Sequence, residues 1–147
     1  MEALPWSEFA SSNPQLAGHV EERLGRAPCY LGTVRPDGWP RVHPVGPLTL
    51  RGGKLVVTMY PSSPKGRDLR RNGRYALHAA VEDTTGGGGE VLLTGTALPA
   101  EPAEADRAKG YIVFELLIAE VLATSYDPTD LHPIRTRWRA ASAEREL

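Results

Sequence analysis

The chain has 147 residues, of which 41% are hydrophobic and 24% are charged, and its formal net charge is −1. This is the composition of an ordinary soluble globular protein, and the length suits one domain over residues 1–147. A net charge so close to zero argues against a general binder of polyanions, so we expect no nucleic acid partner. Cys29 is the only cysteine, which excludes an internal disulfide and a multi-cysteine metal site.

The sequence predicts neither a secretion signal nor a membrane span. Residues 1–6 lack a basic segment followed by an apolar core. The longest apolar run, residues 111–123, contains Glu115 and Glu120 and is too short and too charged to cross a bilayer. Together with the single cysteine, these features predict a cytoplasmic protein with no membrane partner.

The N-terminal segment, residues 1–26, is expected to be helical. Asn13-Pro14 has the sequence of a helix start, Leu16, Val20 and Leu24 recur at four-residue spacing, and Gly25 ends the pattern. Strands are then predicted over residues 29–34, 40–47, 54–59, 75–81, 90–97 and 111–123. Two further short helices are predicted over 64–72 and 102–109. Residues 83–89 hold four consecutive glycines and are expected to form a mobile tip, and residues 127–147 an irregular, charged tail.

Turn sequences join neighbouring strands as hairpins. Arg35-Pro36-Asp37-Gly38 combines a proline that presets φ with an Asp-Gly reversal, and Arg51-Gly52-Gly53 supplies a second turn. Hairpins predict an antiparallel sheet. Six strands with few helices therefore predict a mainly β fold, a small barrel with short helices at its ends or gaps.

The segment that follows the third strand has the features of an anion-binding helix start. Ser63-Pro64 opens the predicted helix, because serine is a good cap and proline suits the first helical position. Free amides and the helix dipole attract an anion there, and Lys65 adds a full charge. Asp68 is the lone acid among five cations: Lys65, Arg67, Arg70, Arg71 and Arg74. We therefore predict a phosphorylated ligand at Ser62, Ser63, Lys65 and Arg67; the alternative is a surface helix with solvated charges.

A second candidate lies on the strand predicted over 40–47. Strand alternation places Arg41, His43 and Val45 on one face and Val42 and Pro44 on the other. A guanidinium beside an imidazole needs solvent or a polar ligand, and the prolines leave backbone groups free for the edge of a heterocycle. The alternative interpretation is an exposed edge strand with incidental polar side chains.

Other groups of residues give weaker evidence for a functional site. The four histidines, at positions 19, 43, 78 and 132, lack the spacing of a zinc protease, and we expect no metal site. A Gly-X-Ser-X-Gly elbow and the Walker and Rossmann phosphate signatures are absent from the sequence. Trp138, flanked by Arg137 and Arg139, suits ring stacking, a dimer contact or packing on the barrel, and packing is the favoured interpretation.

The order of these segments resembles the pyridoxamine 5'-phosphate oxidase-like family of flavin-binding split barrels, in particular its short actinobacterial members. The segments that carry the resemblance are residues 30–34, 37–45, the strand that ends at Thr58-Met59, and residues 63–69 and 74–78. The resemblance implies a six-stranded antiparallel split β-barrel of Greek-key type with short flanking helices. It also implies a homodimer that binds two flavin mononucleotides (FMN) in grooves between the subunits.

The resemblance also implies roles for individual residues. Those implied to contact the cofactor are Ser63, Lys65 and Arg67 at the phosphate, Arg41, Val42 and His43 along the isoalloxazine ring, and Thr58 and Met59 at the ring and ribityl chain. Trp138 and Arg137 resemble C-terminal residues that a partner chain brings to the site. The context of Leu131-His132-Pro133-Ile134-Arg135 departs from the family's substrate-binding pattern, so oxidation of pyridoxamine phosphate itself is not expected.

These observations favour an FMN-binding oxidoreductase of unknown substrate. His43 is the candidate acid or base, and Arg41 is positioned to stabilise negative charge on the flavin ring. The alternatives are a deazaflavin-dependent reductase, whose cofactor has an acidic tail, and a non-catalytic module that binds flavin or haem.

Overall fold

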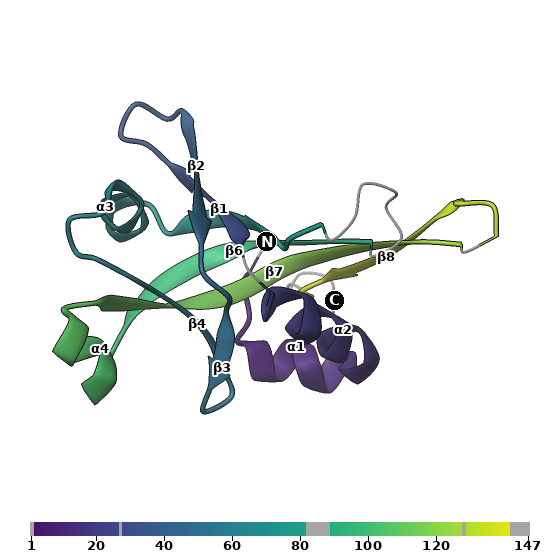
Figure 1. Cartoon of the computed structure of the whole chain (residues 1–147), viewed down its shortest axis with the longest axis horizontal. Helices are drawn as coiled ribbons and strands as arrows, with labels where there is room; N and C mark the ends of the chain where they lie inside the picture. The colour runs from purple at the N-terminus through teal and green to yellow at the C-terminus, as the bar shows by residue number, and fades with distance from the viewer. Residues whose placement is uncertain (1, 27, 82–88, 128, 142–147) are drawn as a thin grey trace.

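The computed structural model describes residues 2–26, 28–81, 89–127 and 129–141. Its helices are α1 (Trp6–Ser12), α2 (Pro14–Leu24), α3 (Pro64–Arg71) and α4 (Glu104–Lys109). Its strands are β1 (Cys29–Val34), β2 (Pro40–Val45), β3 (Thr49–Arg51), β4 (Lys54–Met59), β5 (Arg74–His78), β6 (Glu90–Ala100), β7 (Ile112–Tyr126) and β8 (Pro133–Arg139). All described strand pairs are antiparallel and belong to one sheet, in the order β2-β1-β5-β6-β7-β4-β3, with β8 paired to β7 (Figure 1).

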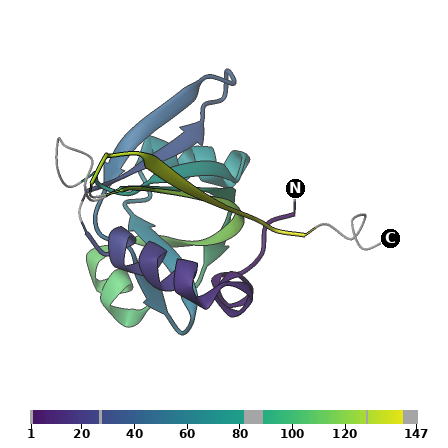
Figure 2. The ribbon, with the colours of Figure 1, turned by 90° about the vertical axis from the view of Figure 1, so that its right-hand side faces the viewer.

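The long strand β7 is the central strand of the sheet and pairs with three others. One edge of β7 pairs with β6, and the other edge is divided between β4, at residues 112–115, and β8, at residues 120–126. Leu4 fills the gap between these two partners by exchanging backbone hydrogen bonds of 2.8 and 2.7 Å with Ile118. The sheet therefore splits along β7, and β4 and β8 leave it in different directions (Figures 1 and 2).

A bulge bends the β6–β7 pair at the centre of the sheet. Thr94 pairs with Glu120 and the next residue, Gly95, pairs with Ile118, so Ala119 is the extra residue. Glycine is required at position 95, because a β-carbon there would overlap the carbonyl oxygen of Leu117. The same oxygen accepts a 2.9 Å hydrogen bond from the hydroxyl of Tyr75. Bulges strengthen twist, which is what a sheet needs to curl toward a barrel.

The core lies between the concave side of this sheet and the helices α1 and α2. Alternate strand residues point inward, and the fully buried ones include Leu31, Leu77, Val91, Leu93, Leu116 and Val121. Phe9 of α1 and Val20 of α2 are also completely buried. Phe9 packs edge-to-face against Trp6 and Trp138, with ring centroids 5.2 and 4.8 Å apart. None of the described helices is long and apolar enough to cross a membrane.

The mainly β, antiparallel fold class is confirmed, with eight strands in the described residues in place of the predicted six. The prediction missed β3 because it has only three residues, paired to β4 across the turn at Gly52-Gly53. It was wrong to expect an irregular tail over 133–139. Strand β8 is almost entirely exposed, so its sequence lacks the alternation that marks a half-buried strand.

Other element boundaries differ from the predicted ones without changing the architecture. Helix α1 was not predicted individually within the helical segment 1–26, while α2 begins and ends where its pattern indicated. The predicted strand over 40–47 ends at Val45, and the one over 75–81 ends at His78. The glycine-rich tip predicted over 83–89 lies outside the described residues except for Gly89. The single domain over 1–147 stays a prediction.

Two glycine-to-alanine variants test the account of the bulge. We expect Gly95→Ala to lower the free energy of unfolding by about 3 kcal/mol, because its methyl group would force the β6–β7 pair apart. Gly18→Ala is the matched control. Its β-carbon would meet nothing within 4 Å, so it should raise the stability of α2 by ~0.5–1 kcal/mol. Urea unfolding of both variants measures the difference, and equal effects at the two positions would contradict this account.

Candidate functional site

Helix α3 begins directly on the end of β4. Pro64 occupies the first helical position, as predicted. Gly66 lets the helix approach the strand, since a β-carbon there would lie 3.1 Å from the sulfur of Met59 and 3.3 Å from Cδ1 of Ile112. Met59 is itself buried. The start of α3 is thereby fixed against β4 and β7.

Ser63 does not cap this helix in the predicted way. It occupies the cap position, but its side chain accepts no backbone hydrogen bond; its hydroxyl oxygen instead accepts a 2.9 Å bond from the ammonium of Lys65. The amides of Gly66 and Arg67 both donate to the carbonyl oxygen of Ser63, at 3.1 and 3.2 Å. The helix start thus has fewer free amides than the sequence suggested, and Lys65 becomes the main attraction for an anion.

Asp68 connects α3 to the β1–β2 hairpin. This carboxylate is 1% exposed and accepts three hydrogen bonds. The donors are Oγ1 of Thr33 on β1 at 2.8 Å, Nε of Arg41 on β2 at 2.7 Å and Nη2 of Arg71 on α3 at 2.9 Å. Two charge-assisted bonds and one neutral bond satisfy a buried acid that would otherwise be costly. The sequence contained the signal, a lone acid among cations, but Asp68 was not proposed as a structural centre.

The surroundings of Asp68 shift its acidity. Burial alone would raise the pKa of this carboxyl, but hydrogen bonds from Arg41, Arg71 and Thr33 outweigh burial, and the pKa is lowered. Asp68 is therefore ionised at neutral pH and holds Arg41 in place as an ion pair.

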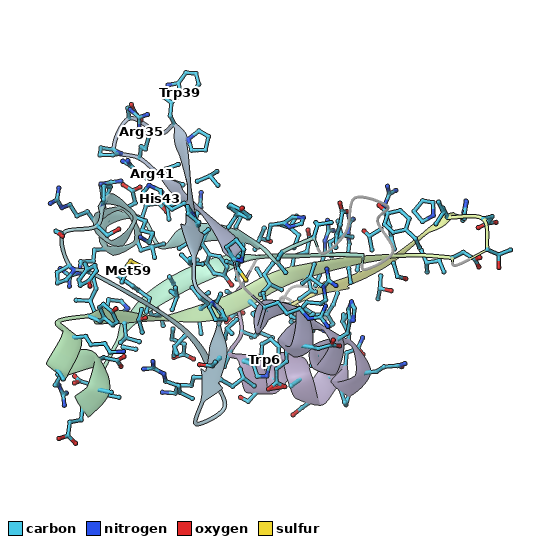
Figure 3. The ribbon with its side chains drawn as sticks, in the orientation of Figure 1. Trp6, Arg35, Trp39, Arg41, His43 and Met59 are labelled. Atoms are coloured by element: carbon cyan, nitrogen blue, oxygen red, sulfur yellow. The ribbon has the colours of Figure 1, made fainter. Side chains whose placement is uncertain are left out.

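Arg41, His43 and Lys65 are brought together by this arrangement. Arg41 and His43 lie on one face of β2, on the side of the hairpin that faces α3 (Figure 3). The pKa of His43 is lowered, first by burial and then by the charges of Lys65 and Arg41, against a smaller opposite effect of Asp68. Burial also lowers the pKa of Lys65. The three groups form a concentrated positive field around a neutral imidazole, and we call them the Arg41–His43–Lys65 cluster.

The other predicted site residues lie in different environments. Val42 points to the opposite face of β2 and is 67% exposed. Thr58 is partly buried and pairs with Val113 on β7, and Arg67 is exposed on α3. Met59 lies beneath Gly66 and supports the helix start. The cluster is thus built from β2 and α3 and is supported from below by β4.

Trp138 is not brought to this cluster within one chain. It lies on β8, where its indole N–H donates a 2.9 Å hydrogen bond to Ser12 and its ring packs on Phe9 of α1. This is the packing role that the sequence favoured. A role for Trp138 at a cofactor would require a second copy of the chain, and it stays a prediction.

A groove elsewhere in the described residues lacks the charged side chains of this cluster. This groove of about 460 Å³ lies between α2 and the ends of β7 and β8, and its lining carries no Lys, Arg, Asp or Glu. Within the described part of the chain, no group of three or more His, Cys, Asp or Glu side chains is placed to hold a metal ion.

Asp68→Asn tests whether this carboxylate holds the site together. We expect the variant to lose about 3 kcal/mol of unfolding free energy at pH 7, because it leaves Arg41 and Arg71 without their buried partner. The folded-state pKa of Asp68 lies below the usual value of about 3.9. The stabilisation is therefore complete above about pH 4 and is lost as pH falls through the folded-state pKa. Urea unfolding from pH 7 to pH 3 measures the free energy of unfolding of the unmodified protein and of the variant. A difference between the two that stays constant over this range would contradict the proposed role of Asp68.

Comparison with known proteins identifies relatives of this fold. Residues 17–133 match the family model described as Pyridoxamine 5'-phosphate oxidase, while a search of curated proteins found no significant match. Among solved structures, a putative pyridoxamine 5'-phosphate oxidase of Lactobacillus delbrueckii is 26% identical, with a TM-score of 0.54 over 69% of this chain and 90% of that one.

Two mycobacterial structures share the fold at lower identity. A conserved hypothetical protein of Mycobacterium tuberculosis is 17% identical, with a TM-score of 0.62 over 72% of this chain and 82% of that one. A heme binding protein of Mycobacterium smegmatis is 17% identical, with a TM-score of 0.60 over 80% of this chain and 56% of that one. Since the family model spans most of the sequence, the chain belongs to the pyridoxamine 5'-phosphate oxidase family.

Proposed function

We propose that this protein is an FMN-binding oxidoreductase whose cofactor phosphate lies at the Arg41–His43–Lys65 cluster. The observation that carries the proposal is the ammonium of Lys65, which is partly removed from water and has a lowered pKa, with the hydroxyl of Ser63 as its hydrogen-bond partner. A phosphate placed there would gain a charge-assisted bond that water competes for only weakly. Arg41 uses Nε to bind Asp68, so its terminal nitrogens remain available for the same anion.

The side chains of this site then have separate roles. Lys65 and Ser63 bind the phosphate, with Arg67 on the exposed side of α3 adding to the field. Arg41 on β2 reaches the same phosphate, and His43, two residues further along the strand, is assigned to the ring, with the backbone of Val42 between them and with Thr58 and Met59 at the ring and ribityl chain. Flavin, when bound, supplies hydride or electron transfer. Because the lowered pKa keeps His43 neutral near pH 7, this imidazole can accept a proton from a substrate or donate a hydrogen bond.

The proposal includes a homodimer with the cofactor at the interface between subunits. In a single chain the three side chains of the cluster stay partly exposed, and Trp138 lies on a different element, β8. A second copy is the simplest source of the residues that would close such a site. The buried thiol of Cys29 is compatible with the proposed cytoplasmic location.

Haem binding is the second candidate function. The heme binding protein of Mycobacterium smegmatis shares this fold, and His43 is a neutral imidazole, the form that ligates iron. A deazaflavin coenzyme stays a further prediction from the arginines of α3. The mass and absorption spectrum of the small molecule that copurifies with the protein would distinguish these cofactors.

Lys65→Glu tests the phosphate position. The variant places a repulsive charge where an attractive one stood, so we expect FMN affinity to fall about 100-fold, roughly 2.7 kcal/mol. Arg107→Glu makes the same charge change on the exposed helix α4 and should bind FMN like the unmodified protein. Quenching of flavin fluorescence measures both dissociation constants. Equal affinities for the two variants would place the phosphate elsewhere.

His43 provides an independent test without any variant. Its pKa lies below the usual value of about 6.5 in the free protein. A bound phosphate would offset the charges of Lys65 and Arg41, so saturation with FMN should raise that pKa. An NMR titration of the imidazole C–H resonance measures the change, and riboflavin, which lacks the phosphate, serves as the control. A His43 pKa that is the same in free and FMN-bound protein would contradict the proposed site.

A further inference from the structure

The tip of the β1–β2 hairpin presents an exposed tryptophan on a rigid support. Arg35 donates its backbone N–H to the carbonyl of Trp39 at 2.8 Å, and Gly38, at φ +86°, donates to the carbonyl of Arg35 at 2.9 Å. The carboxylate of Asp37 accepts from the backbone N–H of Trp39 at 3.1 Å and from the guanidinium of Arg35 at 2.8 Å. Trp39 is nevertheless 69% exposed at the end of the hairpin (Figure 3). An exposed indole on a hydrogen-bonded turn is a ready stacking surface.

This tryptophan continues the row of side chains that forms the proposed cofactor site. Trp39 directly precedes β2, on which Arg41 and His43 share one face, and the bond from the Arg35 N–H to its carbonyl continues the pairing with β1. Strand alternation extended by this one residue places Trp39 on the same face as Arg41 and His43. Of these three residues, Arg41 forms the ion pair with Asp68 of α3. Trp39 therefore lies at the outer end of the row, beyond Arg41, and His43 lies at the inner end.

Arginines of α3 reach the same end of the hairpin. Arg71 donates a 2.7 Å hydrogen bond to the carbonyl of Val34, the residue that pairs with Pro40 next to Trp39. Arg67, Arg70 and Arg71 follow helical spacing and share one exposed face of α3. The nearby carboxylates, Asp37 and Asp68, are already paired. In the described part of the chain neither Arg67 nor Arg70 forms an ion pair, so this surface has excess positive charge.

We propose that Trp39, Arg35, Arg70 and Arg71 bind an adenylate group. We call these four residues the hairpin–α3 site. A purine stacks on an exposed indole, and guanidinium groups take phosphate oxygens as paired donors. The inference rests on the proposed function in that it places this group beyond the first phosphate, at the outer end of the same row. The adenylate can belong to a flavin adenine dinucleotide that occupies both sites, or to a separate pyridine dinucleotide that delivers electrons to bound flavin.

The test measures binding of FMN, flavin adenine dinucleotide (FAD), ADP and NADPH to the full-length protein by calorimetry and tryptophan fluorescence. Trp6 is buried and Trp138 is partly buried, so quenching of the long-wavelength, exposed component reports on Trp39. Variants are Trp39→Leu, Trp39→Phe, which keeps an aromatic ring, and Arg70→Gln, with Arg107→Gln on α4 as the charge-matched control. The three positions, 39, 70 and 107, are all exposed, so the four variants should fold.

We expect adenylate-bearing ligands to quench Trp39 and to bind Trp39→Leu and Arg70→Gln about tenfold or more weakly. Trp39→Phe and Arg107→Gln should stay within about threefold, and FMN affinity should be unchanged in all four variants. Tighter binding of FAD than of FMN would assign the adenylate to the cofactor, and binding of ADP or NADPH to FMN-loaded protein would assign it to a separate donor.

Two results would overturn the inference. One is FMN binding with no quenching of Trp39 by any adenylate ligand. The other is a change of oligomeric state in Trp39→Leu with unchanged adenylate affinity, which would make the indole a protein contact. A protein that binds neither FMN nor FAD at the Arg41–His43–Lys65 cluster, but whose Trp39 is quenched by ADP, would instead overturn the proposed function and retain the hairpin–α3 site.

Discussion

The buried carboxylate of Asp68 is the interaction on which the site depends. It is the point where α3, β1 and β2 meet, through Arg71, Thr33 and Arg41. Without it, the cations of α3 and β2 would repel one another, and the Arg71–Val34 hydrogen bond would be left to attach the hairpin to the helix. With it, one negative charge holds an excess of positive charge in a fixed arrangement. Such an arrangement binds an anion with little further ordering, which is the advantage of preorganisation.

The split of the sheet along β7 determines where this site can form. Because Met59 at the end of β4 pairs with Ile112, the first residue of β7, the chain beyond Met59 is free to turn into α3. Gly66 then allows the helix to lie against Met59. Strand β8 takes the other half of the same edge and carries Trp138 toward α1. One chain therefore places β2 and α3 in one region and β8 in another (Figures 1 and 2). This separation is why the proposed function includes a second subunit.

Local patterns were sufficient to predict most elements and the residues of the cluster. Helix α2 and strands β1, β4 and β7 have strong apolar periodicity, and Ser63-Pro64 marked the start of α3 correctly. The sequence could not reveal β8, whose stability comes from its pairing with β7 and not from its own pattern. It also could not reveal that Ser63 bonds to Lys65 instead of capping the helix, or that Asp68 joins elements 27 and 35 residues away. Those facts depend on contacts between distant segments, which no local propensity encodes.

The central claim is that a flavin phosphate binds beside Lys65 and Arg41. The most direct measurement is a crystal structure of the protein grown with FMN. The account predicts phosphate density within hydrogen-bond distance of the Lys65 ammonium and the Arg41 guanidinium, with the ring running along β2. Flavin bound in another place, or a saturated crystal in which those two side chains contact only protein and water, would contradict it.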